Sequence, residues 1–265
     1  MRHTWKSSIV SRHADATLSN STFAAHGVTA AVGVLVWFTL KGFSEGDEKS
    51  NQHSPSQFFR QVKSVIQLKV VWLQATVLVC ADTSYKAFDQ YALFAVRGHG
   101  IDEIDAAQIV TIGAWTRPIA ALVLGVLGDR WGISRMALVC FVLLIISHSL
   151  FAFTGTALGS LGMILLNTLV TGIAIFGLRG LYFGLLEEGQ VPLAQTGTAV
   201  GVVSVIGFTP DAYVAAMAGF LIDQSPGLLG FQHLFGILLV FSVVGAIAAL
   251  QFPKHVQTRT DQTTA

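Results

Sequence analysis

Seven long apolar stretches place the strongest constraint on how this 265-residue chain folds. Each is close to the roughly 20 apolar residues that a helix, rising about 1.5 Å per residue, needs to cross a bilayer core of about 30 Å. The stretches cover residues 23–40, 70–96, 107–127, 136–153, 158–186, 196–222 and 233–252. The sequence therefore predicts an all-α integral membrane protein.

The character of these stretches separates them from soluble helices and from strands. A soluble helix averages about 11 residues and has one polar face, whereas residues 136–150 (MALVCFVLLIISHSL) are apolar on all sides. A transmembrane barrel strand is about 10 residues long and alternates in polarity, which these stretches do not. The glycine pairs 180/184 and 197/201 have the four-residue spacing that lets membrane helices pack closely.

Composition excludes several classes of protein. Only 12% of the residues are charged and 52% are hydrophobic, which excludes a disordered chain. Two cysteines cannot form a disulfide framework, and a net charge of +1 provides no phosphate-neutralising surface for a nucleic acid. The sequence lacks the phosphate-loop, HExxH and paired-cysteine motifs, so we expect no cofactor and no bound metal.

Basic residues predict the orientation of the helices, because Lys and Arg in short loops mark the cytoplasmic side. The loops on one side and the tail contain Lys49, Arg60, Lys63, Lys69, Arg130, Arg135, Lys254 and Arg259. The alternate loops contain only Arg97. We therefore expect a multi-pass plasma membrane protein, in a bacterium an inner membrane protein, with a cytoplasmic C-terminus.

These expectations divide the chain into five parts. They are an external tail or remnant loop (1–21), a transmembrane helix (22–41), a cytoplasmic linker (42–69), a six-helix bundle (70–252) and a cytoplasmic tail (253–265). The basic residues of the first part would lie outside, against the charge rule, which favours a chain that begins in the middle of a larger protein. Within the linker, residues 57–68 have the pattern of a short amphipathic helix at the membrane surface.

The loop between the third and fourth apolar stretches carries the most specific motif. It reads GVLGDRWGISR over residues 125–135 and resembles the cytoplasmic loop signature of the major facilitator superfamily, G-x-L-a-D-r-x-G-r-k-r. The matching residues are Gly125, Leu127, Asp129, Arg130, Gly132 and Arg135. Ile133 and Ser134 stand where the family commonly has basic residues.

The resemblance implies an architecture and a role for the loop. In the family, twelve helices form two six-helix halves, and this chain is similar to helix six, the central loop and helices seven to twelve. The resemblance implies that the loop locks one conformation, with Asp129 meeting residues 196–198. The alternative is a tight turn that only fixes topology. Glu187 and Glu188 begin another cytoplasmic loop, and we expect them to be solvated.

Charged residues within the apolar stretches are the candidate site, because a charge at membrane depth is costly and usually faces a cavity or a partner. The candidate cavity residues are Asp82, Tyr85, Lys86, Asp89, Arg117, Arg179 and Asp211. The spacing of residues 82, 86 and 89 places them on one face of a continuous helix. One interpretation is a set of internal ion pairs. In the other, Lys86 and Arg117 bind an anionic group and Asp82 or Asp89 responds to protons.

Together these features predict a secondary active transporter of a small solute, working by alternating access as a symporter or antiporter. The resemblance favours the permeases for organic anions and sugar phosphates. A missing N-terminal half or a second copy would cover the charged face within the bilayer. The alternatives are a non-transporting or accessory membrane fragment and, with less support, an intramembrane enzyme using Asp82 and Asp211 as a carboxylate pair.

Overall fold

The computed structural model describes Val34 and residues 55–154, 160–225 and 227–264, and within these ranges every regular element is helical. The chain divides into two compact units, Met1–Gln57 and Phe58–Ala265, and the architecture below is that of the second. Five of its helices are long and apolar enough to cross a membrane, or six if one bent pair is a single span. This confirms the all-α membrane fold. The predicted first transmembrane helix, 22–41, lies outside the described residues except for Val34.

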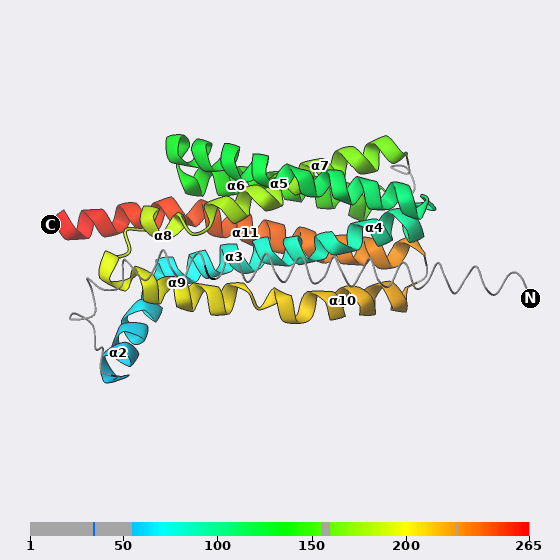
Figure 1. The fold of residues 1–265 in the computed structure, drawn as a ribbon. Helices are drawn as coiled ribbons and strands as arrows, with labels where there is room; N and C mark the ends of the chain where they lie inside the picture. Colours follow the sequence, from blue (N-terminus) through cyan, green and yellow to red (C-terminus); the bar gives the residue numbers. More distant parts are fainter. Residues whose placement is uncertain (1–33, 35–54, 155–159, 226, 265) are drawn as a thin grey trace, which may run out of the picture. The chain divides into compact units, whose positions relative to one another are not determined.

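The helices of the second unit follow the predicted apolar stretches in order (Figure 1). They are α2 (Pro55–Ile66), α3 (Lys69–Ala87), the 3-10 turn η1 (Phe88–Gln90), α4 (Tyr91–Leu93), the π-helical η2 (Phe94–Gly98), α5 (Glu103–Trp131), α6 (Ile133–Phe153), α7 (Leu161–Leu181), α8 (Leu185–Glu188), α9 (Leu193–Gly207), α10 (Pro210–Gln224) and α11 (Leu228–Thr264). Helix α11 continues through most of the predicted tail.

Helix α2 turns sharply away from the bundle. Its axis makes an angle of 80° with the span that begins at α3, and the indole N–H of Trp72 donates a hydrogen bond of 2.8 Å to the carbonyl of Ile66 across the bend. Val65 is fully buried, whereas Lys63 on the same short helix is exposed. This two-sided pattern agrees with the predicted amphipathic helix.

Two of the membrane spans are broken partway along their length. The first changes from α-helix to a 3-10 turn immediately after Ala87. The second is interrupted between α9 and α10, where Pro210 occupies the first turn of α10. Proline has no N–H to donate and is therefore favoured in the first turn of a helix, where that N–H would have no partner within the helix. As a result, Lys86 lies in the last turn of α3 and Asp211 in the first turn of α10.

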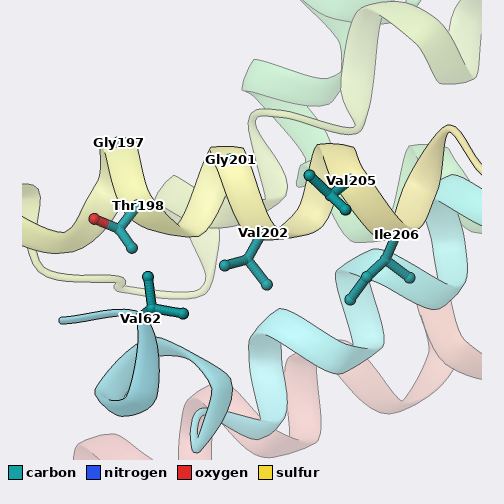
Figure 2. A pocket seen from close by; sticks show the side chains of 7 residues that line it. All are labelled: Val62, Gly197, Thr198, Gly201, Val202, Val205 and Ile206. Atoms are coloured by element: carbon teal, nitrogen blue, oxygen red, sulfur yellow. The ribbon is translucent and has the colours of Figure 1, made fainter. Parts of the chain in front are cut away.

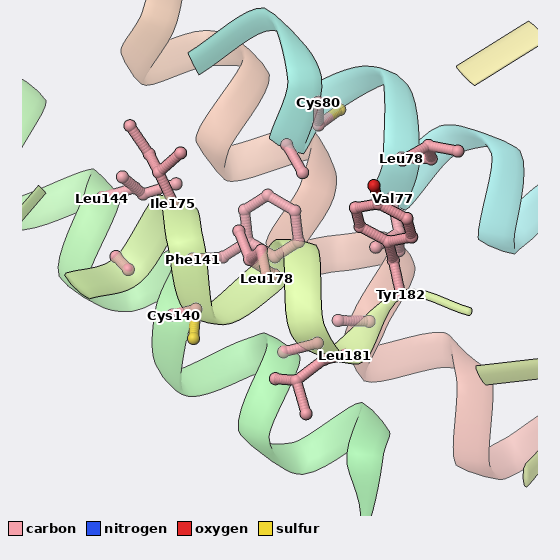
Figure 3. Close-up of a cluster of buried hydrophobic side chains, with 14 of the residues drawn as sticks. Val77, Leu78, Cys80, Cys140, Phe141, Leu144, Ile175, Leu178, Leu181 and Tyr182 are labelled. Atoms are coloured by element: carbon pink, nitrogen blue, oxygen red, sulfur yellow. The ribbon is translucent and has the colours of Figure 1, made fainter. Parts of the chain in front are cut away.

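A core of apolar side chains joins α3, α6 and α7 (Figure 3). Phe141, Leu144, Ile175 and Leu178 are almost completely buried in it. The two cysteines, Cys80 and Cys140, are free thiols and also lie in this core. This packing fixes the positions of α3 and α7, which carry most of the candidate site.

Helices α5 and α7 approach each other at backbone distance through glycines. A Cβ atom added to Gly180 would lie 3.1 Å from the carbonyl oxygen of Ala121, and one added to Gly172 would lie 2.9 Å from the hydroxyl of Thr116. Small residues allow this close approach in membranes. This close approach brings Arg117 of α5 near the face of α7 that carries Arg179.

Candidate functional site

Four membrane helices bring six of the predicted cavity residues together. Helix α3 contributes Asp82, Tyr85 and Lys86, whereas α5, α7 and α10 contribute Arg117, Arg179 and Asp211. Two ion pairs cross between the helices. Arg179 Nη1 lies 3.5 Å from Asp82 Oδ1, and Lys86 Nζ lies 2.9 Å from Asp211 Oδ1.

The ring of Tyr85 lies at the centre of this charged cluster. The guanidinium carbon of Arg179 is 4.0 Å from the ring centroid, and that of Arg117 is 5.9 Å away. The Lys86 ammonium lies at 5.5 Å. A cation within about 6 Å of an aromatic centroid is attracted by the ring quadrupole. Three cations therefore lie around the ring of Tyr85, which attracts them but carries no negative charge that would neutralise them.

Arg117 differs from the other two cations because it forms no ion pair with any of the described residues. Its guanidinium instead lies 4.7 Å from the ring centroid of Phe176, whose ring packs edge-on against Tyr85 at 6.3 Å. The residue is exposed on α5. Phe176 was not among the predicted site residues, although it lies three residues before Arg179 and therefore on the same face of α7.

The two ion pairs have different environments. Asp82 is only 3% exposed, and its Oδ2 atom has no hydrogen-bond partner among the described residues. Lys86 and Asp211 are 33% and 50% exposed. The end of α3 favours the lysine and the start of α10 favours the aspartate, because helix dipoles are negative at the C-terminus and positive at the N-terminus.

Asp89 has no ion pair with this cluster, although the sequence groups it with Asp82 and Lys86. It is exposed and makes no ion pair with the described residues. Asp89 lies in the 3-10 turn η1, beyond the end of α3 at Ala87. Without Asp89 the cluster has three cations and two carboxylates, so its formal charge is +1.

The motif of residues 125–135 forms the tight turn between α5 and α6. Gly132 connects the two helices with φ of 98°, a conformation that favours glycine. Asp129, Arg130 and Arg135 are exposed. Within the described ranges Asp129 makes no hydrogen bond or ion pair, so its predicted contact with residues 196–198 is not formed here.

A different carboxylate reaches this turn. Glu188 Oε2 accepts a hydrogen bond of 2.8 Å from the backbone N–H of Ser134, and its Oε1 accepts one of 2.5 Å from the Ser134 hydroxyl. The expectation that Glu188 is solvated is therefore wrong. Its carboxylate satisfies a free N–H in the first turn of α6, where a negative charge is also favoured by the helix dipole.

An apolar pocket of about 500 Å³ lies between α2 and α9, away from the charged cluster (Figure 2). Its lining consists of Val62, Gly197, Thr198, Gly201, Val202, Val205 and Ile206. No lining side chain is charged, so the pocket offers no chemistry for an ionised solute. Among the described residues, no group of three or more His, Cys, Asp or Glu side chains could hold a metal.

The sequence also matches a known family of membrane proteins. The model of the Major Facilitator Superfamily matches residues 14–210, which is more than half of the chain. The chain belongs to the major facilitator superfamily. Members of this superfamily are generally membrane transporters, so the charged cluster lies on helices of a transporter-type bundle.

Two curated proteins from Escherichia coli (strain K12) are similar to the chain. Inner membrane protein YihN is 22% identical over 245 residues, which are 88% of this chain and 56% of the relative. Inner membrane protein YqcE is 22% identical over 233 residues, which are 86% of this chain and 54% of the relative. The chain thus spans about half the length of the curated relatives that it matches.

Proposed function

We propose that this bundle forms one half of a secondary transporter for small organic anions and that Arg117 provides the principal contact with the anion. The observation that carries the proposal is the unpaired guanidinium of Arg117, held over the rings of Phe176 and Tyr85. A guanidinium is always charged and can bind a carboxylate or phosphate through two parallel hydrogen bonds. The aromatic rings orient it without using its hydrogen-bond donors.

The charge of the cluster supports an anion over a neutral or cationic solute. The pairs Lys86–Asp211 and Arg179–Asp82 leave one positive charge, which a bound anion would offset. An unpaired charge at membrane depth is costly. Binding an anion therefore removes an electrostatic penalty, whereas a cationic solute would increase it.

The proposed transport cycle also requires a second helical bundle. The most apolar window of α5 is only 22% buried within the described part of the chain, and Arg117 lies on this helix. In alternating access, two bundles rock about a site between them. We propose that a second bundle faces this side of α5. It would be formed either by further sequence, of the kind that makes the relatives longer, or by a second copy of the chain.

Ligand-dependent stability of the purified full chain tests the anion site. Malate and glucose 6-phosphate should stabilise the protein, and glucose and lysine should not. A ligand at 100 times its Kd stabilises the folded state by about 2.7 kcal/mol. Arg117→Gln should weaken the anion effect at least tenfold, whereas Arg97→Gln, at an exposed arginine of η2, is the matched control. Stabilisation by glucose that persists in Arg117→Gln would reject the site.

A second candidate function is a non-transporting accessory protein, which the exposed face of α5 also favours. Mass determination in mild detergent and anion uptake into proteoliposomes distinguish the two. A dimer that takes up malate or glucose 6-phosphate supports a half-transporter. A folded monomer that neither binds nor moves any of the four solutes supports the accessory role.

A further inference from the structure

Two apolar pockets lie next to the bend between α2 and α3. The first, of about 500 Å³, lies between α2 and α9, and the second, of about 350 Å³, is lined by residues of α3, α9 and α11. Ile206 lines both pockets, so they adjoin. The second is also lined by Trp72, whose indole N–H is bonded to the carbonyl of Ile66 across the bend. One pocket therefore touches each side of the bend.

The first pocket is elongated and follows α9. Its lining residues on that helix extend from Gly197 to Ile206, which corresponds to about 14 Å along the helix axis. Figure 2 shows Thr198 facing Val62 at one end and Val205 with Ile206 at the other. Among the described lining residues, Thr198 has the only polar side chain. A slot that is apolar along its length and polar at one end fits a hydrocarbon chain attached through an ester group.

Three basic side chains lie on α2 and at the start of α3. Arg60 and Lys63 are one helical turn apart on α2, and Lys69 is the first residue of α3. All three are exposed, and none forms an ion pair with the described residues. Lys63 directly follows Val62, which lines the first pocket. Lys69 lies one turn before Trp72, which lines the second. The cations are thus beside both pockets but outside their apolar lining.

The angle of the bend places these cations at the surface of a bilayer. Helix α2 lies at 80° to the span that begins with α3, so α2 lies nearly in the plane of the membrane when that span crosses it. The distribution of basic residues predicts that this end of the helices is cytoplasmic. The cytoplasmic leaflet contains anionic lipids, which attract basic segments next to a membrane helix. The cations therefore lie at the level of lipid headgroups, and the pockets extend toward the hydrocarbon.

We infer that the α2–α3 bend binds one anionic diacyl phospholipid, with its phosphate among Arg60, Lys63 and Lys69 and one acyl chain in each pocket. Charge complementarity selects this occupant. A zwitterionic lipid fills the same pockets but leaves the three cations without a net counter-charge. A protein helix would have to bring several acidic residues to the bend as well as an apolar face. The site is separate from the charged cluster, so the inference does not depend on the proposed anion transport.

Native mass spectrometry of the full chain in mild detergent tests the headgroup contacts. The probes are phosphatidylglycerol and phosphatidylethanolamine with identical acyl chains. Each Lys or Arg near the surface favours an anionic lipid by about fivefold, so phosphatidylglycerol should bind at least tenfold more tightly. The triple variant Arg60→Gln, Lys63→Gln and Lys69→Gln should reduce this preference to less than twofold.

The matched control replaces Arg130 and Arg135 by glutamine, because they are exposed cations on the same predicted side of the membrane. This double variant should keep the tenfold preference. Equal binding of the two lipids by wild type, or an unchanged preference in the triple variant, would overturn the inference.

Brominated acyl chains test the second pocket, because bromine quenches the fluorescence of a nearby indole. The full chain is placed in phosphatidylcholine vesicles that contain a small, equal fraction of brominated phosphatidylglycerol or phosphatidylethanolamine. The Trp72 signal is the difference between wild type and Trp72→Phe. Brominated phosphatidylglycerol should quench it at least threefold more than brominated phosphatidylethanolamine. Equal quenching would show that no anionic lipid is held beside Trp72.

The variant Gly201→Phe tests the first pocket by filling it. A Cβ atom added to Gly201 would have no described neighbour within 4 Å, and the same holds for Gly219 of α10, which provides the matched control Gly219→Phe. Gly201→Phe should weaken phosphatidylglycerol binding at least fivefold, and Gly219→Phe less than twofold. If Gly201→Phe leaves lipid binding unchanged but converts a dimer into a monomer, a second copy of the chain fills this pocket and the inference is wrong. Quenching of Trp72 in the wild-type chain still decides the question if Gly201→Phe does not fold.

Discussion

Replacing Arg179 by glutamine should strongly destabilise the protein, because it leaves Asp82 buried without its ion-pair partner. Breaking a buried pair by removing one side costs roughly 3–5 kcal/mol. Here the atoms are 3.5 Å apart and the Arg179 side chain is 35% exposed. Those two features reduce the cost, so we expect the free energy of unfolding to fall by about 2–3 kcal/mol, below that range.

The companion variant isolates the buried charge as the cause. Adding Asp82→Asn to Arg179→Gln removes the carboxylate and should recover about half or more of the lost stability, as expected for residues that share one interaction. Unfolding by sodium dodecyl sulfate in mixed micelles at pH 8 measures all four proteins of the cycle. A loss below about 0.5 kcal/mol in the single variant, the size of an ordinary surface substitution, would refute the reasoning. So would a double variant that is no more stable than Arg179→Gln.

Three further predictions concern other parts of the bundle. Glu188→Gln should lower the free energy of unfolding by about 1–2 kcal/mol because it weakens the charge-assisted bonds to α6, whereas Glu187→Gln, at an exposed position, should change it little; detergent unfolding compares the two. Gly180→Val should push α5 away from α7 and lower the free energy of unfolding by about 1–3 kcal/mol. Gly197→Val is the control, because no described atom lies within 4 Å of a Cβ added there; it should leave the melting temperature unchanged. Burial lowers the pKa of His99 below its ordinary value of 6.5, so near that pH the unfolded chain binds more protons than the folded one. The stability that is present above pH 6.5 should therefore be lost as the pH falls. Melting curves at pH 5 and pH 8 should show a smaller loss for His99→Gln than for wild type.

The membrane fold was predictable because its determinant is local. A stretch such as residues 136–153 must be a membrane helix whatever its neighbours are, since its length and uniform apolarity have no other common solution. The family motif was also local, and its turn has the glycine geometry that the spacing indicated. Of the predicted glycine pairs, Gly180 packs against Ala121 of α5, whereas Gly184 lies beyond the end of α7 beside Ile133. A Cβ atom added to Gly197 or Gly201 would have no described neighbour within 4 Å.

The candidate site was only partly predictable because it depends on contacts between helices. The sequence identified the charged residues but not their pairing, and it gave no reason to choose Asp82 over Asp89. That difference depends on the burial of Asp82 and its contact with Arg179 of α7, which arise only when the helices pack together. Phe176 and Glu188 were missed because an aromatic residue in an apolar stretch and an acid in a loop are ordinary until their partners are known.

The two breaks in the membrane spans have a mechanical consequence. The pair Lys86–Asp211, 2.9 Å apart, ties the end of α3 to the start of α10, so both spans are interrupted at the same level. Two broken spans that are joined at their breaks can bend together, with the ion pair as the common hinge point. Motion of α10 would then carry the segment after Ala87 with it, and a solute that loosens this pair would uncouple the two.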